Sequence, residues 1–375
     1  MDSSLPEPGP QARAASRALL AYLGSVLGAT DNWISFARYM ELALYQPGLG
    51  YYAGGAAKLG AAGDFVTAPE LGTLFAHTLA RQVAALLEPD AAILEFGAGS
   101  GALAAALLDA LPAGQPYFIV EPSAELAERQ RKRIGGRAQW LERLPQSFRG
   151  VVLANEVLDA MPVHAVAWTR DGIAERGVCV NEGTLAWSER PAAGAVLSAA
   201  RAIELALPPS ERYESELGLA ARAWIGELAG VLEAGVILIL DYGFPAREYY
   251  HPQRSMGTLM CHYRHRAHGD PFYLPGLQDI TAHVDFSALA HSAADAGLDV
   301  LGYASQAEFL LNCGLTEILA TTDAAEVRRY APLAAQAHTL LSPAEMGELF
   351  KVLALGRGVT QPLAGFSRGD RTHTL

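Results

Sequence analysis

Cysteine is scarce in this chain of 375 residues, which contains only Cys179, Cys261 and Cys313. Because these three are far apart and odd in number, they indicate neither a disulfide framework nor a Cys-x-x-Cys metal site. Long hydrophobic runs are also lacking. The longest, GVILIL at 235–240, is well short of the roughly 20 residues that a membrane-spanning helix needs, so we expect no membrane insertion.

Positive charge is in short supply as well. The sequence has 28 Lys and Arg residues against 40 Asp and Glu, a formal net charge of −12. This balance argues against nucleic acid as a partner, because phosphate binding needs concentrated basic surface. The first 16 residues contain no apolar signal core, and Asp2 and Glu7 are unlike a transit peptide. We therefore expect a cytoplasmic location.

The N-terminal part, 1–90, is expected to consist of helices and a loop. Apolar residues recur at helical spacing over 11–44 and predict two helices, broken near Asp31. The stretch 45–70 is rich in glycine and contains aromatic residues. This composition is typical of a long ordered loop, and such loops are commonly functional.

From residue 91 the pattern alternates between apolar strands and helices. Continuous apolar strands separated by helices indicate a parallel sheet covered on both faces, so the sequence predicts an α/β, doubly wound, Rossmann-like core over 91–355. The strands are expected at 91–96, 116–121, 150–155 and 235–241, and helices at 102–111, 123–134, 284–296, 305–312, 324–340 and 343–354.

Two inserted α+β segments are expected within this core, at about 163–232 and 243–283. Short alternating runs in the first predict antiparallel strands, followed by helices near 194–206 and 214–232. The second insertion is dense in Tyr, His, Arg and Pro and has little periodicity. The C-terminal tail, 356–375, is expected to be frayed.

The first predicted strand of the core is followed by the run GAGSG at 97–101, directly ahead of a helix. Glycines let the backbone take positive φ and approach a ligand closely, and the start of a helix offers unpaired N–H groups. Glu121 ends the next strand, where a carboxylate can accept hydrogen bonds from both hydroxyls of a ribose. These features predict a site for a nucleotide-like ligand.

Two cofactors fit this turn. Gly97, Gly99 and Ala102 satisfy the G-x-G-x-x-[GA] dinucleotide fingerprint, so the turn alone leaves an NAD-type ligand open. Glu95, Gly97, Gly99 and Gly101 form the E-x-G-x-G-x-G pattern of S-adenosylmethionine (SAM) sites, in which an acid at the strand end supports the turn. The dinucleotide pattern does not require Glu95, so SAM is favoured.

The strand GVVLAN at 150–155 places Asn155 and Glu156 at the carboxyl end of the predicted sheet, where ligands of such folds bind. If a helical turn begins after Glu156, then Glu156 and Asp159 share one face. Asn155 can orient a substrate or cofactor amine, and the two carboxylates can hold a cationic substrate. In the alternative, structural interpretation, Asp159 caps a helix and Glu156 is a solvated loop acid.

Several phrases of the sequence resemble the SAM-dependent methyltransferases related to MidA, the mitochondrial complex I assembly factor. They are GDFVTAPELG (63–72), EFGAGSGALA (95–104), ANEVLDAMPVH (154–164), DYGF (241–244), and YYHPQRSMGTLMCHYRH with DITAHVDFSAL (249–265 and 279–289). The resemblance runs from about Tyr39 to Leu355. It implies a class I SAM methyltransferase fold and transfer of methyl groups to arginine, on a subunit of respiratory complex I.

The resemblance also implies roles for further residues. Asp64 and Thr67 of the glycine-rich loop are expected over the methionine part of SAM. Asp241 and Tyr242 are expected to border the pocket, and His283 is expected to belong to it. For three of these residues a structural role is the alternative: a cap for Asp64, packing for Tyr242 and a structural histidine for His283.

The chemistry of an arginine acceptor suits the two acids after 150–155. A guanidinium is a poor nucleophile because its lone pairs are delocalised and it stays protonated, with a pKa above about 12. Carboxylates against its fork can fix its plane, and a proton must also be lost during or after transfer. We expect Glu156 to form this clamp, with Asp159 as the second choice.

The run CHYRHRAH at 261–268 offers four potential metal ligands. Structural zinc sites usually take ligand pairs from separate segments, so we predict no metal and favour a cap over the substrate channel. Two other functions stay open at this level. One is a SAM-binding assembly or scaffold protein with little turnover, and the other is an NAD-dependent oxidoreductase.

Overall fold

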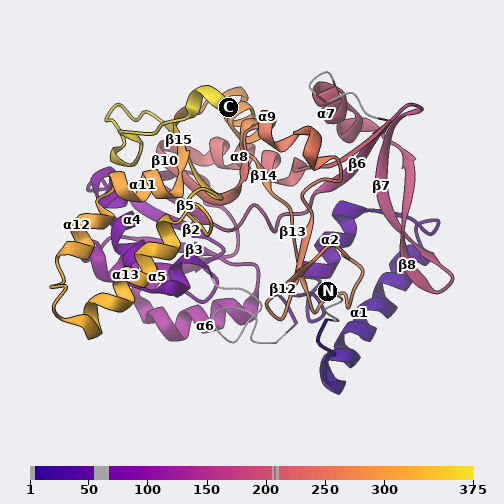
Figure 1. The fold of residues 1–375 in the computed structure, drawn as a ribbon, viewed down its shortest axis with the longest axis horizontal. Coiled ribbons are helices and arrows are strands. Elements are labelled where there is room, and N and C mark those ends of the chain that lie inside the picture. The colour runs from indigo at the N-terminus through magenta and orange to yellow at the C-terminus, as the bar shows by residue number, and fades with distance from the viewer. Residues whose placement is uncertain (1–4, 55–66, 205–206, 208–210) are drawn as a thin grey trace. The chain divides into compact units, whose positions relative to one another are not determined.

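The computed structural model describes residues 5–54, 67–204, 207 and 211–375 (Figure 1). The chain divides into two compact units. The sheet unit comprises Val66–Leu158, Ala223–Pro245 and Phe286–Leu375. The insertion unit comprises Met1–Phe65, Asp159–Arg222 and Ala246–Asp285.

The sheet unit is built on a mixed sheet whose main path has the strand order β15-β16-β10-β5-β2-β3-β4. The strands from β4 to β10 along this path run parallel, and β16 is antiparallel to both of its neighbours. The bounds are β2 (Ala92–Phe96), β3 (Tyr117–Val120), β4 (Gln139–Leu141), β5 (Phe148–Asn155), β10 (Leu232–Phe244), β15 (Asp299–Ser305) and β16 (Phe350–Arg357).

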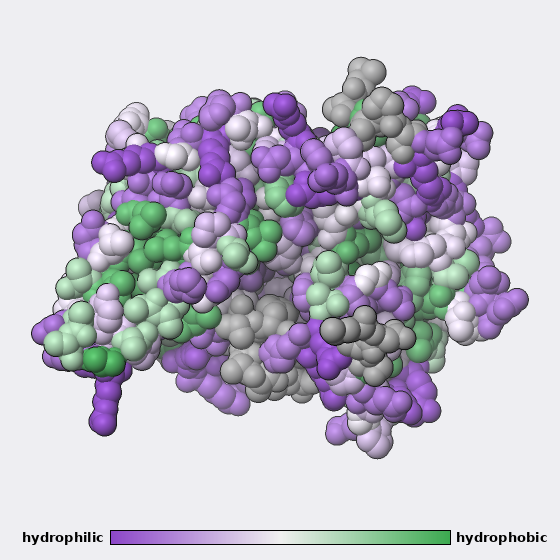
Figure 2. Space-filling view, in the orientation of Figure 1, coloured by the Kyte–Doolittle hydropathy of each residue, from purple (hydrophilic) through white to green (hydrophobic). Residues whose placement is uncertain are grey.

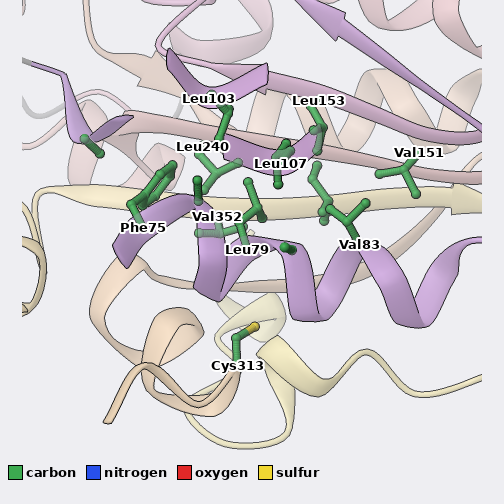
Figure 3. Packing of buried hydrophobic residues seen from close by; sticks show 14 of the residues in the cluster. Phe75, Leu79, Val83, Leu103, Leu107, Val151, Leu153, Leu240, Cys313 and Val352 are labelled. Atoms are coloured by element: carbon green, nitrogen blue, oxygen red, sulfur yellow. The ribbon is translucent and has the colours of Figure 1, made fainter. Parts of the chain in front are cut away.

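Apolar side chains cover both faces of this sheet. On one face, Phe75 of α4 (Thr73–Leu86) belongs to the same buried cluster as Val151 and Leu153 of β5 (Figure 3). Val152, which points to the opposite face, is equally buried. The central parts of these strands are therefore apolar on both faces, as expected for parallel strands covered by helices.

The remaining helices of the sheet unit connect and flank these strands. They are α3 (Ala68–Leu71), α5 (Ala102–Ala110), α6 (Ala124–Ile134), α10 (Phe286–Asp295), α11 (Gln306–Asn312), α12 (Leu315–Ala320) and α13 (Val327–Leu341). α8 (Leu219–Val231) leads into β10, and its Trp224 meets Phe96 of β2 edge to face, with 5.0 Å between ring centroids.

The direction in which the chain adds strands reverses between β2 and β5. From β2 the chain continues to β3 and β4 on one side, and it then returns to β5 on the other side of β2. In open α/β sheets, ligands bind outside the carboxyl ends of the strands at such a switch point. The glycine run after β2 and the polar residues after β5 both lie at this position in the topology.

The insertion unit combines helices with two antiparallel sheets. The larger sheet has the order β1-β7-β6-β9, with β8 paired to β7, and the smaller has the order β12-β11-β13. The elements are α1 (Pro10–Gly28), β1 (Ile34–Ser35), α2 (Phe36–Tyr45), β6 (His164–Thr169), β7 (Gly172–Asn181), β8 (Thr184–Pro191), α7 (Gly194–Glu204), β9 (Arg212–Leu217), α9 (Ala246–Tyr249), β11 (Met260–Tyr263), β12 (Arg266–His268), β13 (Asp279–Thr281) and β14 (Val284–Asp285).

The α/β fold class is confirmed, as are the two N-terminal helices, the four apolar strands and the antiparallel strands of the first insertion. The helix expected at 343–354 is wrong, because β16 occupies Phe350–Arg357. Val352 and Leu355 within it are fully buried. A run that is apolar on every side fits a central strand as well as a buried helix, so periodicity could not separate the two.

Two other expectations need correction. The helix expected at 214–232 is shorter, because β9 continues to Leu217 and α8 begins only at Leu219. The tail expected to be frayed is held in place: the backbone N–H of Tyr303 donates to Asp370 (3.0 Å), and Phe366 is buried.

The segment 1–90 contributes to both units, and 55–66 of its glycine-rich loop lies outside the described residues.

The surface in Figure 2 mixes hydrophilic and hydrophobic residues. Leu311 on α11 and Val327 on α13 are among the large apolar side chains that solvent reaches, with 40% and 66% of their surface exposed. Hydrophobic residues gather on the part of Figure 2 that these helices occupy in Figure 1. Among the described residues, we find no helix with the length and hydrophobicity needed to cross a lipid bilayer.

Glycine is required where β2, β5 and β10 approach one another. Gly150 has a φ of +134°, and a Cβ there would lie 2.0 Å from the carbonyl oxygen of Ala92. We expect Gly150→Ala to destabilise the fold by more than about 3 kcal/mol or to prevent folding, because backbone strain and a backbone clash add. Denaturant unfolding checks this, and wild-type stability in the variant would contradict the strand register.

Gly226 of α8 is the matched control for this substitution. It is an exposed helical position with open space around the Cβ that alanine would add. We expect Gly226→Ala to raise stability by ~0.5–1 kcal/mol, because alanine loses less backbone entropy in a helix.

Candidate functional site

The register of the sheet aligns the strand ends that carry the candidate residues. Phe96 of β2 pairs with Val120 of β3 on one side and with Ala154 of β5 on the other. In turn, Asn155 pairs with Leu240 of β10. The residues that follow Phe96, Val120 and Asn155 therefore lie level with Asp241 at the carboxyl ends of the parallel strands. All of them belong to the sheet unit.

The glycine run has the geometry predicted for it. Gly97, Gly99 and Gly101 have φ values of +58°, +54° and +77°, in the left-handed region that favours glycine. The N–H of Gly97 donates to the carbonyl of Val120 (3.0 Å), and α5 begins directly after Gly101. No side chain caps this helix start, so the local backbone suits the close approach of a polar ligand.

Glu95 lies beneath the turn as a buried acid of β2, with 2% of its surface exposed. It accepts a hydrogen bond from the hydroxyl of Tyr117 (2.7 Å). Burial raises the pKa of Glu95 to about 7, the bond from Tyr117 opposes that rise, and the charge of Glu121 adds to it. The hydrogen bond of Glu95 thus links β2 to β3, and its support of the glycine turn stays a prediction.

Glu121 follows β3 and is half-buried. Its Oε1 accepts the backbone N–H of Ser123 (2.9 Å), and its Oε2 accepts the side-chain amide of Gln130 (2.9 Å). Burial raises the pKa of Glu121, and the hydrogen bonds from Ser123, Gln130 and the Gly99 N–H oppose that rise. The carboxylate is therefore fixed beside the glycine run, where a ribose would lie.

Asn155 ends β5 and Glu156 directly follows it, and both are half-buried. Glu156 Oε1 accepts the side-chain amide of Asn155 (3.2 Å) and the backbone N–H of Ala68 (3.3 Å). Thr67, the N-cap position of α3, directly precedes Ala68. The structure thus brings Thr67, Asn155 and Glu156 together at the end of β5, whereas Asp64 lies outside the described residues.

The helical turn expected after Glu156 does not form. Glu156 has a φ of +53°, which no residue of a right-handed helix adopts, and its N–H donates to the carbonyl of Leu240 (2.9 Å), extending the pairing with β10. Bends and turns follow, so Glu156 and Asp159 do not share a helix face. Asp159 belongs to the insertion unit, where it is buried and its carbonyl accepts the N–H of Ala282 (3.0 Å).

Asp241 of β10 holds the turn after β5. It is fully buried, and its two oxygens accept the backbone N–H groups of Leu158 and Tyr242, both at 2.9 Å. Tyr242 is half-buried and packs edge to face on Phe350, with 5.5 Å between ring centroids. A non-glycine residue with positive φ costs roughly 1–3 kcal/mol, and Asp241 helps to offset this strain at Glu156.

His283 and the histidine-rich run both belong to the insertion unit. His283 is half-buried, and its backbone N–H donates to the hydroxyl of Thr258 (3.1 Å). The histidine-rich run forms the β11–β12 hairpin, with Arg264 and His265 at positive φ in its turn. Within the part of the chain that the structure describes, no three His, Cys, Asp or Glu residues come together as a metal site.

Sequence reasoning missed two groups of residues around the glycine run. Gln130 of α6 is fully buried and bonds both Gly99 and Glu121. Ser100 bonds Glu70 of α3 and Arg133 of α6. No short motif could reveal these groups, because Gln130 and Gly99 are 31 residues apart and Ser100 and Glu70 are 30 residues apart. The only signal in the sequence is a polar residue, Gln130, at a core-facing position of α6.

The sheet order, the glycine run and the acid at the end of β3 define a SAM-dependent methyltransferase of Rossmann-like fold. Residues 74–304 match the model of a family of S-adenosyl-L-methionine-dependent methyltransferases, and the chain belongs to this family. SAM is therefore its cofactor, and the NAD alternative is set aside.

Solved and curated relatives agree with this placement. The chain is 50% identical to a COG1565 superfamily member from Burkholderia thailandensis, whose crystal structure contains S-adenosyl-homocysteine; the match covers 99% of this chain and 100% of that one, with a TM-score of 0.94. It is 28% identical to the mitochondrial protein arginine methyltransferase NDUFAF7 of Danio rerio over 94% of this chain and 93% of that protein, and 28% identical to the Homo sapiens NDUFAF7 over 86% and 80%.

The buried acid beneath the turn should give stability a distinct dependence on pH. With a folded pKa of about 7 against an ordinary 4.5, Glu95 keeps its proton in the folded protein while the unfolded chain releases it. Its contribution to stability therefore falls between pH 4.5 and 7, by roughly 3 kcal/mol in total, and stays low above that range.

Glu95→Gln removes this titration and keeps an oxygen for Tyr117. We expect the stability of this variant relative to wild type to rise by roughly 3 kcal/mol between pH 4.5 and pH 8, measured by denaturant unfolding. The exposed Glu128 of α6 is the control, and Glu128→Gln should show little change. If the stability of Glu95→Gln and that of wild type change with pH in the same way, the pKa of Glu95 is not raised.

Proposed function

We propose that the chain methylates arginine side chains of a protein, and that the acceptor is a subunit of respiratory complex I. The observation that carries this proposal is the placement of Glu156: a carboxylate held at the end of β5, at the switch point of a SAM-binding sheet. Relatives that are named protein arginine methyltransferases and align over nearly the whole chain support the same acceptor chemistry.

The residues after β2 and β3 fit SAM. The positive φ values of the glycine run need glycine, and a Cβ on Gly97 would lie 3.1 Å from Val157, so side chains there would crowd the space over the turn. Gly97, Gly99 and Gly101 would hold the cofactor through the backbone, Glu121 would accept the ribose hydroxyls, and Thr67 would border the methionine part. SAM supplies an activated methyl group on a sulfonium.

The residues after β5 act on the acceptor. In-line methyl transfer is limited mainly by the alignment of nucleophile and methyl group in a site that restricts water. Glu156 would accept hydrogen bonds from the guanidinium fork, which fixes its plane and favours electron density on the attacking nitrogen. A carboxylate can accept about four hydrogen bonds, so the bonds from Ala68 and Asn155 are compatible with this role.

The other candidate residues keep more limited roles in this proposal. Asn155 would orient Glu156 through the bond between their side chains. Asp241 would act through the backbone, by holding the turn that carries Glu156. Asp159 and His283 belong to the insertion unit, so their place in the acceptor pocket stays a prediction.

Glu156→Gln removes the negative charge of the side chain and keeps its shape, including an oxygen that can accept the Ala68 N–H. We expect the variant to bind S-adenosyl-homocysteine within about threefold of wild type and to lose methyl transfer by about 100-fold or more, since the lost charge acts on the acceptor. Calorimetry measures the first quantity, and transfer of a labelled methyl group to protein measures the second.

The control for this variant is Glu233→Gln, which removes an exposed acid of the same unit. Wild-type turnover in Glu156→Gln would remove Glu156 from its proposed role. Equal loss of cofactor binding and of turnover would instead assign Glu156 to the cofactor site.

The acceptor is tested by incubating the protein and labelled SAM with a complex I-containing membrane extract, followed by mass spectrometry of arginine peptides. We expect dimethylarginine on a complex I subunit. Label on another residue type would contradict the arginine proposal. Tight cofactor binding without any label would favour the scaffold alternative.

A further inference from the structure

We propose that Gln130 is a positioning residue of the SAM site, whose side-chain amide locks the glycine run and Glu121 into one arrangement. Gln130 lies on α6 and is fully buried. Its Nε2 donates to the carbonyl oxygen of Gly99 and to Glu121 Oε2, both at 2.9 Å. One amide group therefore ties together the two elements that would contact the sulfonium end and the ribose of the cofactor.

A third hydrogen bond fixes which way the Gln130 amide points. The indole Nε1 of Trp140, in β4, donates to Gln130 Oε1 at 2.8 Å. An indole N–H can only donate, so the amide oxygen must face Trp140 and the NH₂ group must face Gly99 and Glu121. The orientation of the amide thus follows from the chemistry of its partners.

Close packing leaves the amide little freedom to move. A Cβ on Gly101 would lie 3.4 Å from both Cα and Cγ of Gln130, and 3.2 Å from Ile134 one turn further along α6. α6 therefore packs directly against the end of the glycine run at Gly101. Two more side chains of α6 hold the surroundings of Gln130: Arg131 stacks on the Trp140 ring at 5.0 Å, and Arg133 bonds Ser100.

Gln130 would affect cofactor binding through the charge and orientation of the Glu121 carboxylate. Burial raises the pKa of this carboxyl group, and the donated hydrogen bonds from Ser123, Gln130 and Gly99 favour its charged form. A charged carboxylate accepts about four hydrogen bonds, which leaves capacity for a ribose hydroxyl. Without the Gln130 amide, Glu121 would lose its orientation and part of its support as an anion.

This inference rests on the proposed ribose contact of Glu121, and it is independent of the acceptor. It is tested with Gln130→Met, which keeps the volume of the side chain and removes its hydrogen bonds. We expect S-adenosyl-homocysteine to bind about tenfold more weakly by calorimetry, because three buried bonds are lost, including the one that Glu121 accepts as a charged group. Turnover at saturating SAM should fall much less, so that KM for SAM rises more than kcat falls.

A ribose analogue separates positioning from general damage to the fold. Wild type should prefer S-adenosyl-homocysteine over its 2′-deoxyribose analogue, and this preference should shrink in Gln130→Met, since Glu121 is no longer oriented toward the hydroxyl. Trp140→Phe is the matched control: it removes the third bond and keeps both donors, so affinity should stay within about threefold. Wild-type affinity and an unchanged ribose preference in Gln130→Met would overturn the proposal.

Gln130→Glu gives an independent test if the methionine variant does not fold. The new carboxylate would face Glu121, and Glu95 is the next acid nearby. Two adjacent carboxylates share a proton at low pH, which restores a donor between them. As the pH rises from 5.5 to 8, this variant should lose affinity for S-adenosyl-homocysteine. We expect this loss to be at least about tenfold larger than the loss in wild type over the same range. The same pH profile as wild type would contradict the proposal.

Discussion

The register of the parallel strands is the constraint on which the rest of the structure depends. Pairing of Phe96 with both Val120 and Ala154, and of Asn155 with Leu240, brings the ends of β2, β3 and β5 level with Leu240 of β10. The glycine run, Glu121 and Glu156 directly follow these three ends, and Asp241 is the next residue of β10. A shift of one residue in any strand would move its polar residue out of line and turn its apolar side chains to the wrong face.

Three buried or half-buried acids are stabilised at this edge in three different ways. Glu95 relies on a single tyrosine hydroxyl and has a pKa of about 7. Asp241 is fully buried and accepts two backbone N–H groups. Glu121 accepts both backbone and side-chain donors. Since each unpaired charge in the interior costs several kcal/mol, these partners explain how the site keeps acidic groups inside an apolar sheet.

Most of the sheet unit could be predicted from the sequence, because its strands are short apolar runs separated by helices and its glycine run has a recognisable spacing. The two strands at the other edge were harder. β16 reads as a helix because its centre, Val352 to Leu355, is apolar on every side, and β15 (Asp299–Ser305) is too mixed in character to stand out. Both form because they pair with each other and with β10, a long-range interaction that local pattern does not contain.

At the site, the sequence pointed to the glycine run, Glu121, Asn155 and Glu156, but not to how these residues are held. The positive φ of Glu156 depends on pairing with β10 and on the bond from Leu158 to Asp241, which lies 83 residues beyond Leu158 in the chain. The amide of Gln130 depends on Trp140 and Gly99 in the same way. Such contacts are set by tertiary structure, and a polar residue at a core position of a helix is the sole local trace that they leave.

A crystal structure with S-adenosyl-homocysteine and an arginine peptide would test the central claim most directly. The account predicts the ribose on Glu121, the homocysteine end over the glycine run, and guanidinium nitrogens about 3 Å from the Glu156 carboxylate. A cofactor bound away from the glycine run, or a guanidinium held by other residues while Glu156 keeps to Ala68 and Asn155, would contradict it.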